Sequence, residues 1–248
     1  MMHVRWLLMM AFLAAGALPA QAQFSALPGV LRLSAADSAQ AAFVQIRNEG
    51  DEPMQFRIYL GDYDQAVNGD YDFQEFGSNP RSCDGRISFF PDNTVLGPGE
   101  EQEIQVRMEK GETCWGLLFI ESGAAGDGQV RVAQRIGVRV LNVPAGLSYE
   151  GEVAEVSATP ADSVTVDVVF RNIGEAPVEL RGRVEIRDLA GAAVASVGVG
   201  PLGVLPAHAR RFQVVLPRAM RPGEYIAVPI LDFGADYLAG GQALFTVP

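Results

Sequence analysis

From Val30 onward, hydrophobic and polar positions alternate along the chain with a period of two residues. One alternating run leads into Arg47 and the next one follows Pro53. A period of two places successive side chains on opposite faces and is typical of half-buried antiparallel strands. Residues 114–120 are apolar on both faces, which predicts a central strand between two others. Helical periodicity is not evident after the N-terminal segment, so the pattern indicates an all-β chain.

The turn between the first two runs occurs twice. Residues 47–53 read Arg-Asn-Glu-Gly-Asp-Glu-Pro, and residues 171–177 read Arg-Asn-Ile-Gly-Glu-Ala-Pro. Asn and Gly suit the backbone angles of a tight turn, and Pro begins the next strand without losing a needed N–H. A second match relates Pro98 to Pro206. The repeat predicts two modules of about seven short strands each, as in immunoglobulin-like β-sandwiches.

The N-terminal segment has the features of a signal peptide. Arg5 precedes an apolar run over residues 7–18, and Ala20-Gln21-Ala22 has the small side chains of a cleavage site. A membrane-spanning helix needs about 20 apolar residues, so an uncleaved anchor is the less favoured alternative. We expect a signal peptide (1–22) followed by two tandem immunoglobulin-like domains (23–143 and 144–248). We expect no membrane span after signal removal.

The charge balance limits the class of partner. The chain has 19 Lys and Arg residues against 30 Asp and Glu residues, a net charge of −11. An acidic surface repels phosphate backbones, so nucleic acid and anionic membranes are not expected as partners. A solubilising surface is the simplest explanation of the charge.

Two cysteines, Cys83 and Cys114, are an even number in a chain that we expect to be exported, and they predict one disulfide. The loop that this disulfide closes has about thirty residues, which corresponds to about 3–4 kcal/mol in the chain-entropy model. A redox or metal role would need a C-x-x-C motif or nearby histidines. After signal removal the only histidine is His208.

Residues 64–75 partly match a calcium-binding loop. Asp64, Asn68, Gly69 and Asp70 hold ligand or turn positions of that loop, but Ala66 removes a ligand and the flanking segments are strands. Asn68-Gly69 is also a strong signal for a two-residue hairpin turn. We favour a hairpin, and calcium binding is the alternative. Aromatic residues that alternate after this turn would cover the sandwich edge or form a contact patch.

Neither nucleotide binding nor catalysis is expected. Residues 198–203 match G-x-G-x-x-G, but Pro201 lies inside the motif and no helix begins there, so we expect a loop between strands. A G-x-S-x-G motif is absent from the sequence, and His208 lies in a polar turn. We therefore predict that the protein is not an enzyme and needs neither a cofactor nor a metal.

The last strand expected in the first module, 130–141, has two different faces. Its apolar positions face the core, whereas Arg131, Arg135 and Arg139 line the opposite face. On an edge strand, such charges protect against unwanted strand pairing. The alternative is that this basic ladder binds an acidic strand or a carboxylate of a partner.

The segments Val30-Leu31-Arg32-Leu33, 47–50, 96–100 and 134–144 carry a resemblance to a known family. Over residues 27–144 the chain resembles periplasmic pilus-assembly chaperones of the PapD type. The resemblance implies two immunoglobulin-like domains and a subunit held by strand addition. It also implies that Arg135, at the start of the final strand, and Arg32, as a second basic anchor, bind the terminal carboxylate of the client.

These observations predict a non-enzymatic, periplasmic or secreted binding protein with a chaperone-like role. Its partner would be an exported or surface protein, such as a pilus or fimbrial subunit, bound through strand edges and a basic strand face. The candidate partner-binding residues are Arg32, Arg131, Arg135 and Arg139. The alternative is a structural or adhesive module that binds the cell surface or cell wall, because the chain also resembles two-domain cell-wall interaction proteins.

Overall fold

The computed structural model describes residues 24–123, 133–216 and 220–248. The predicted signal peptide (1–22) and Arg131 lie outside the described residues. The described part contains strands and no helix, and hence no helix long and apolar enough to cross a membrane. The all-β prediction is therefore confirmed.

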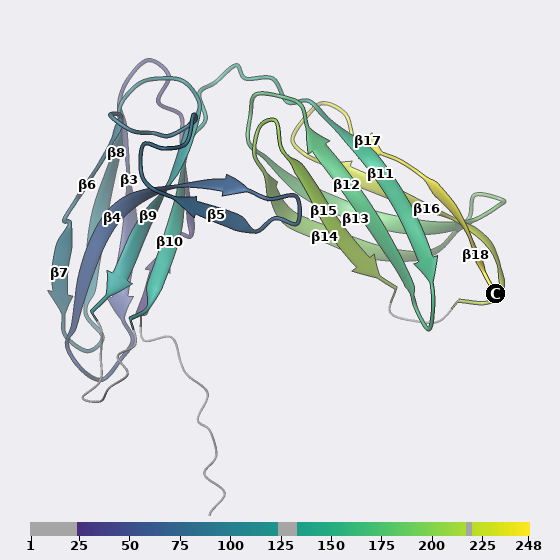
Figure 1. Ribbon diagram of the computed structural model, residues 1–248, viewed down its shortest axis with the longest axis horizontal. Helices are drawn as coiled ribbons and strands as arrows, with labels where there is room; N and C mark the ends of the chain where they lie inside the picture. The colour runs from purple at the N-terminus through teal and green to yellow at the C-terminus, as the bar shows by residue number, and fades with distance from the viewer. Residues whose placement is uncertain (1–23, 124–132, 217–219) are drawn as a thin grey trace, which may run out of the picture.

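Strands β1–β10 form domain one, which has two sheets packed face to face (Figure 1). Its strands are β1 (Phe24–Leu27), β2 (Val30–Leu33), β3 (Gln40–Asn48), β4 (Met54–Gln65), β5 (Tyr71–Gln74), β6 (Ile87–Phe90), β7 (Asn93–Leu96), β8 (Glu101–Met108), β9 (Cys114–Ser122) and β10 (Arg135–Asn142). One sheet has the order β1-β3-β8-β6. The other has the order β2-β10-β9-β4-β5, with β7 also paired to β4.

The core of domain one lies between its two sheets. The alternating apolar positions of the sequence point inward, since Val44, Ile46, Phe56 and Ile104 are fully buried. The chain changes sheets at Pro28, because β1 pairs with β3 whereas β2 pairs with β10. As predicted, β9 is a central strand, paired with β10 on one side and β4 on the other.

Strands β11–β18 form domain two, a second sandwich (Figure 1). Its strands are β11 (Gly151–Pro160), β12 (Val164–Asn172), β13 (Val178–Asp188), β14 (Ala193–Val204), β15 (Ala209–Val215), β16 (Gly223–Asp232), β17 (Ala239–Gly240) and β18 (Ala243–Val247). One sheet has the order β11-β12-β15. The other has the order β14-β13-β16-β17, with β18 also paired to β16. The prediction of two tandem sandwiches is confirmed, with more strands in domain one than expected.

One expectation about local structure was wrong. Residues 198–203 lie inside β14 rather than in a loop, because Gly200 adopts a φ of +99° and the register shifts there without ending the strand.

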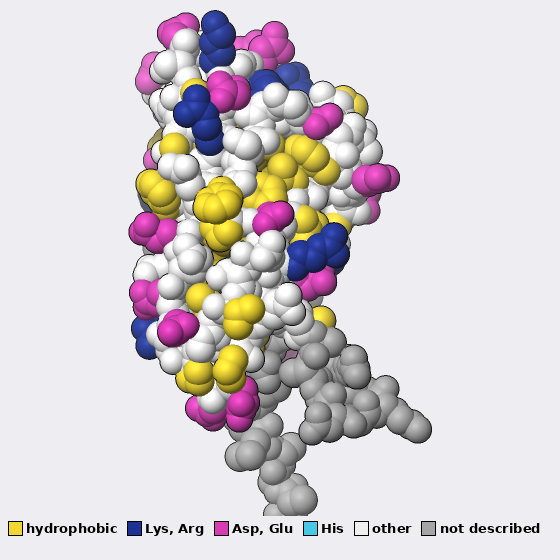
Figure 2. Space-filling view, turned by 90° about the vertical axis from the view of Figure 1, so that its left-hand side faces the viewer, with side chains coloured by type: hydrophobic (Ala, Val, Ile, Leu, Met, Phe, Trp, Pro, Cys, Tyr) yellow, Lys and Arg dark blue, Asp and Glu magenta, His cyan; other side chains and the backbone are white. Residues whose placement is uncertain are grey.

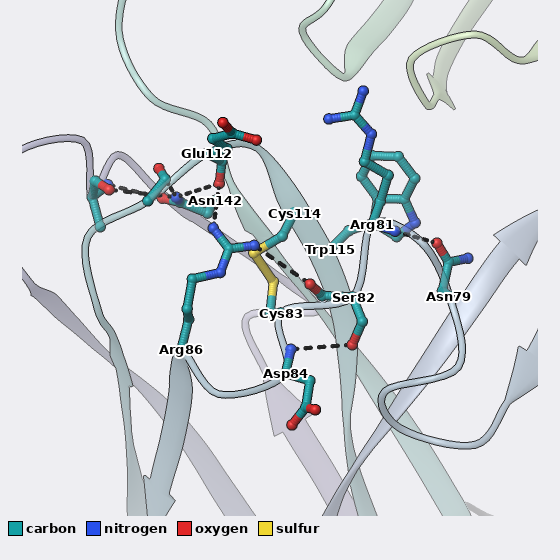
Figure 3. Close-up of a disulfide and its surroundings, with 12 residues drawn as sticks. Asn79, Arg81, Ser82, Cys83, Asp84, Arg86, Glu112, Cys114, Trp115 and Asn142 are labelled. Carbon is teal, nitrogen blue, oxygen red and sulfur yellow. Dashed lines mark hydrogen bonds between the residues drawn. A yellow bond between two sulfur atoms is a disulfide. The ribbon is translucent and has the colours of Figure 1, made fainter.

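The Cys83–Cys114 disulfide is present and buried, with the two Cα atoms 5.2 Å apart. It ties the segment before β6 to the start of β9 (Figure 3). Arg86 crosses the same junction, since its Nη1 donates to the carbonyl of Glu112 at 2.8 Å. The buried Asn142 on β10 also donates to that carbonyl, at 3.0 Å, so three neighbouring segments are joined here.

The repeated turn motif contains a buried asparagine in each domain, whose side chain joins two parts of the chain by hydrogen bonds. We call this arrangement an asparagine staple. In domain one, Nδ2 of Asn48 donates to the carbonyls of Glu52 and Leu96, at 2.8 and 3.0 Å. In domain two, Nδ2 of Asn172 donates to the carbonyls of Ala176 and Val204, at 2.9 and 3.1 Å. Both asparagines are fully buried. Each staple joins the repeated turn to the residues just before Pro98 or Pro206. The hydrogen bonds therefore explain why the Asn-x-Gly turn and the later proline turn recur together in both domains.

Replacing either asparagine by alanine leaves buried carbonyls without their donors. We expect Asn48→Ala and Asn172→Ala each to lower the free energy of unfolding by about 2–3 kcal/mol. Urea titration followed by fluorescence measures this change. The matched control is Ile173→Ala in the same turn, whose side chain is 53% exposed and whose effect should stay within about 0.5 kcal/mol. Equal stabilities of Asn172→Ala and Ile173→Ala would contradict the role of the staple.

Candidate functional site

The end of β4 and the whole of β5 form a hairpin arm, residues 62–74. β4 pairs with β9 as far as Gly61, and Asp62–Gln65 then pair with Gln74–Tyr71. The arm extends from domain one toward domain two (Figure 1). Its turn contains Asn68 and Gly69 but is longer than the predicted two-residue turn. The N–H of Gly69 donates to the carbonyl of Ala66, and Gly69 has a positive φ of +86° whereas Asn68 does not. The predicted hairpin is thus confirmed.

The acidic side chains of the arm have other partners than a metal ion. Asp62 is fully buried and accepts hydrogen bonds from the backbone N–H groups of Gly77 and Asn79 and from the hydroxyl of Ser82. Asp64 contacts His208 of domain two. In the described part of the chain, no cluster of three or more His, Cys, Asp or Glu side chains is suited to hold a metal.

The arm rests on the outer face of the larger sheet of domain one through aromatic rings. Phe119 of β9 lies over two glycines, since an added Cβ at Gly61 or Gly137 would come within 2.5 or 3.3 Å of its ring. Phe73 of the arm contacts Phe119 edge to face, at 5.6 Å between ring centres. The Arg135 guanidinium lies 4.5 Å from the centre of Phe119 and 5.8 Å from that of Phe73. Such cation–π contacts contribute about 0.5–1 kcal/mol each at exposed sites.

Arg139 makes the corresponding contact nearer domain two. Its Nη1 donates to the hydroxyl of Tyr71 at 2.8 Å, and its guanidinium lies 5.7 Å from the centre of that ring. Tyr71 in turn packs edge to face on Tyr63, at 5.1 Å. The two described arginines of the predicted ladder therefore both contact aromatic side chains of the arm.

The arm is hydrogen bonded to the end of β14, to the turn that follows and to β15 of domain two. Gln65 is buried and uses both ends of its amide: Nε2 donates to the carbonyl of Gly203 at 2.9 Å, and Oε1 accepts from the N–H of Leu205 at 3.1 Å. The N–H of Arg211 donates to the carbonyl of Val67 at 2.6 Å. These three hydrogen bonds are all between the domains, so the arm joins them directly.

A small apolar cluster completes this interface. Leu205 of domain two is 5% exposed and packs with buried side chains of domain one. Those side chains are Tyr63, Trp115, Leu117, Phe119 and Leu141. Burial of a leucine side chain contributes about 1.5–3 kcal/mol, so this contact stabilises the docked arrangement.

A cavity of about 190 Å³ lies between the two domains, next to this cluster. Two arginines of domain one, Arg32 and Arg139, line it together with Tyr63 and Gln65. Arg32 is held from the other side, since its Nη2 donates to the carbonyl of Pro177 in domain two at 2.7 Å. A guanidinium has five N–H donors, so both arginines keep further donors for a ligand.

Burial raises the pKa of the Tyr63 phenol well above its usual range, and the positive charge of Arg139 opposes this shift only in part. Tyr63 therefore stays protonated at neutral pH. Glu179 also lines the cavity, and its carboxylate is paired with Arg181. The two guanidinium groups and the protonated phenol are therefore still chemically suited to an anion, and a carboxylate matches the planar fork of an arginine.

The described residues of the predicted site do not all lie at the cavity. Arg32 and Arg139 line the same cavity, but Arg135 lies four residues before Arg139 on β10, a rise of roughly 13 Å. Arg131 is outside the described residues. Sequence reasoning did not assign Tyr63, Gln65 or Tyr71 to the site. For Tyr71, the alternating aromatic pattern after the Asn-Gly turn was the available signal.

β10 is an edge strand over only part of its length. β2 runs parallel to β10 and pairs with Arg139–Asn142. In the described part of the chain, residues 135–138 pair with β9 on one side, and no strand pairs with them on the other. The expectation of an edge strand along the whole of residues 130–141 was therefore too broad, because the sheet switch at Pro28 places β2 beside the second half.

Solved structures share this two-domain architecture. The class 5 fimbriae chaperone CfaA matches with a TM-score of 0.51 and 12% sequence identity, over 91% of this chain and 99% of that one. A chain of the chaperone–tip adhesin complex of CFA/I fimbriae biogenesis matches with the same score and identity, over 90% and 98%. The fold is that of a fimbrial chaperone. At this identity the likeness concerns the fold alone, and neither a protein-family model nor a curated protein matches the sequence.

The fimbrial-chaperone fold confirms the immunoglobulin-like prediction for both sandwiches and accounts for 90% of the chain. The resemblance seen over residues 27–144 in the sequence thus extends, at the level of fold, through domain two.

Domain one has another surface with exposed aromatic side chains. On the β1-β3-β8-β6 sheet, Phe43 and Phe90 are 50% and 75% exposed and line a shallow hollow of about 500 Å³ together with Gln105. The side of the domain that carries β6 and β7 shows hydrophobic side chains between charged ones (Figure 2). This hollow belongs to the opposite sheet from the arginine ladder.

Gly69 provides a test of how the arm docks. A Cβ added there would lie 0.7 Å from Nη1 of Arg210 in domain two, and the φ of +86° disfavours any side chain. We expect Gly69→Ala to displace Arg210 and to speed hydrogen exchange of the Arg211 amide by about tenfold or more. Gly198→Ala is the control, since nothing lies within 4 Å of its added Cβ. An unchanged exchange rate in Gly69→Ala would show that the arm does not depend on this contact.

Proposed function

We propose that the protein is a non-enzymatic, chaperone-like binding protein that holds an extended segment of another exported protein along the open edge of β10. The observation that carries this proposal is the position of that edge. Residues 135–138 lead along β10 toward Arg139 and the cavity between the domains. A strand-binding edge and an anion-binding cavity are therefore consecutive on one strand.

Strand addition suits this edge because its main-chain groups give affinity to an extended segment of almost any sequence. A segment that runs parallel to β10 would place its C-terminus at the cavity. Arg32, Arg139 and the protonated Tyr63 would then bind its terminal carboxylate by charge-assisted hydrogen bonds, each stronger than a neutral one. The same geometry favours Arg139, rather than Arg135, as the partner of Arg32 in anchoring the client.

The comparisons and the sequence support the class of role and the compartment. The structures that share this fold include a chain described as a fimbriae chaperone and one from a chaperone–tip adhesin complex. By this likeness, the proposed client is a pilus or fimbrial subunit. The signal-peptide prediction and the buried disulfide support export to an oxidising compartment, which we propose to be the periplasm or the cell exterior.

The proposal predicts that tagged protein, purified from the compartment to which its own cell exports it, carries a stoichiometric protein partner. We expect Arg139→Glu and Arg32→Glu each to reduce the recovered partner by about tenfold or more, because a carboxylate then faces a carboxylate. Arg107→Glu is the matched control: it introduces the same charge change on the opposite sheet, at an exposed arginine that pairs with Glu109. Purification without a stoichiometric partner, or an equal loss of recovered partner with Arg107→Glu, would contradict the proposal.

The hollow at Phe43 and Phe90 favours a second candidate function, an adhesive or cell-wall-binding module. Exposed aromatic rings beside Gln102, Gln105 and Asn93 suit stacking on sugar rings, with amides available for hydroxyl groups. For this function, the full chain should sediment with insoluble peptidoglycan and Phe90→Ser should release it. Sedimentation that is absent, or that Phe90→Ser leaves unchanged, would exclude the module in favour of the chaperone-like role.

A further inference from the structure

Arg139, which lines the cavity, is oriented by a residue of the arm rather than by its own strand. Its Nη1 donates to the Tyr71 hydroxyl at 2.8 Å, and the Tyr71 ring packs on Tyr63. Tyr71 pairs with Gln65 across the arm, so these two residues move together with the hairpin. The direction of the Arg139 guanidinium therefore depends on where the arm lies.

The arm is held in place from domain two by His208. Nε2 of His208 lies 2.5 Å from Oδ1 of Asp64, and Nδ1 lies 2.8 Å from the carbonyl oxygen of Pro206. Both ring nitrogens are thus engaged, one toward the arm and one toward the turn that carries His208. The ring also lies edge to face with Trp115, at 6.5 Å between centres. These contacts leave the imidazole a single direction.

Neither His208 nor Asp64 lines the cavity. His208 is two residues from Pro206 in the β14–β15 turn. It contacts Asp64, which precedes Gln65 at the end of β4. An influence of His208 on a ligand in the cavity can pass through the arm to Tyr71 and Arg139, or through its own turn to Leu205, which also lines the cavity. The Arg139 signal described below reports the first route alone. This separation makes an indirect effect measurable, because a substitution at His208 removes no atom of the cavity wall.

We infer that His208 and Asp64 are positioning residues for the carboxylate site: their contact fixes the arm on domain two, and the arm in turn holds Arg139 toward the cavity. The inference rests on the proposed function, since it names what orients the anchoring arginine. It assigns a purpose to the acidic start of the arm, to the one histidine of domain two and to the Arg139–Tyr71 contact together. It also makes the affinity of the cavity depend on the docking of the two domains.

The test uses the full exported chain and a small probe, the capped dipeptide acetyl-threonyl-valine, with either a free C-terminal carboxylate or a C-terminal amide. NMR titration gives the ratio of the two dissociation constants. We expect the unmodified chain to prefer the carboxylate by about tenfold, which corresponds to about 1.4 kcal/mol. His208→Ala should reduce this preference by about fivefold or more, whereas His208→Gln, which keeps an N–H donor toward Asp64, should restore it to within about twofold.

Arg211→Ala is the matched control in the same segment. The Arg211 side chain pairs with the exposed Glu155 of domain two, and its backbone N–H, which the substitution keeps, donates to the arm. This variant should keep the carboxylate preference of the unmodified chain. A preference that survives in His208→Ala, or that falls equally in Arg211→Ala, overturns the positioning role.

A second measurement separates this inference from the proposed function. The NMR signal of the Arg139 Nε–H group reports the orientation of its side chain without any ligand. It should shift in His208→Ala and return in His208→Gln. Equal binding of both probes by the unmodified chain counts against the carboxylate site and hence the proposed function, and an Arg139 signal unchanged in His208→Ala overturns the positioning role even when the carboxylate is preferred.

Discussion

The structure depends on the contact between the arginines of β10 and the aromatic rings of the arm. Beyond Gly61, β4 no longer pairs with β9, and a two-stranded hairpin alone is marginally stable in water. Arg135 on Phe73 and Phe119, and Arg139 on Tyr71, hold this hairpin against the outer face of the sheet. Without that support the arm would not reach Gly203 and Leu205 in a fixed direction, and the interface between the domains would lose the polar contacts that the arm makes.

The same contact changes the interpretation of the arginine ladder. A strand that complements a partner through its side chains would present apolar residues outward, whereas β10 presents Arg135 and Arg139 on that face. The structure directs both side chains across the sheet toward the arm, not toward the open edge. The backbone of residues 135–138 remains available for pairing, while the side chains connect domain one to the hairpin. The sequence suggested two roles for the arginine ladder, protection of the edge and binding of a partner. The structure adds a third role, in which the arginine side chains stack on the aromatic rings of the arm.

Much of the fold followed from local rules in the sequence. The period of two located the strands around Val44 and Phe56, the repeated Asn-x-Gly turn gave the two sandwiches, and the two cysteines gave the disulfide. The destination of the arm could not be predicted in this way, because Asp64 and His208 are 144 residues apart and no local pattern links them. The acidic residues of the arm resembled a calcium loop because the sequence does not show that Asp64 has its partner, His208, in the other domain. Arg32 and Arg139 were recognised as basic anchors or ladder positions, but their common cavity exists only because domain two closes it.

The two asparagine staples also make the core of each sandwich independent of the number of residues between the two hydrogen-bonded ends. Asn48 reaches a carbonyl 48 residues later, and Asn172 reaches the equivalent carbonyl only 32 residues later. The longer segment contains the arm and Cys83, yet closing it costs only about 0.4 kcal/mol more in loop entropy. The sandwich thus tolerates large changes of length between fixed ends. The shorter segment of domain two, with its exposed β13–β14 turn, is accordingly a natural place to graft a designed loop.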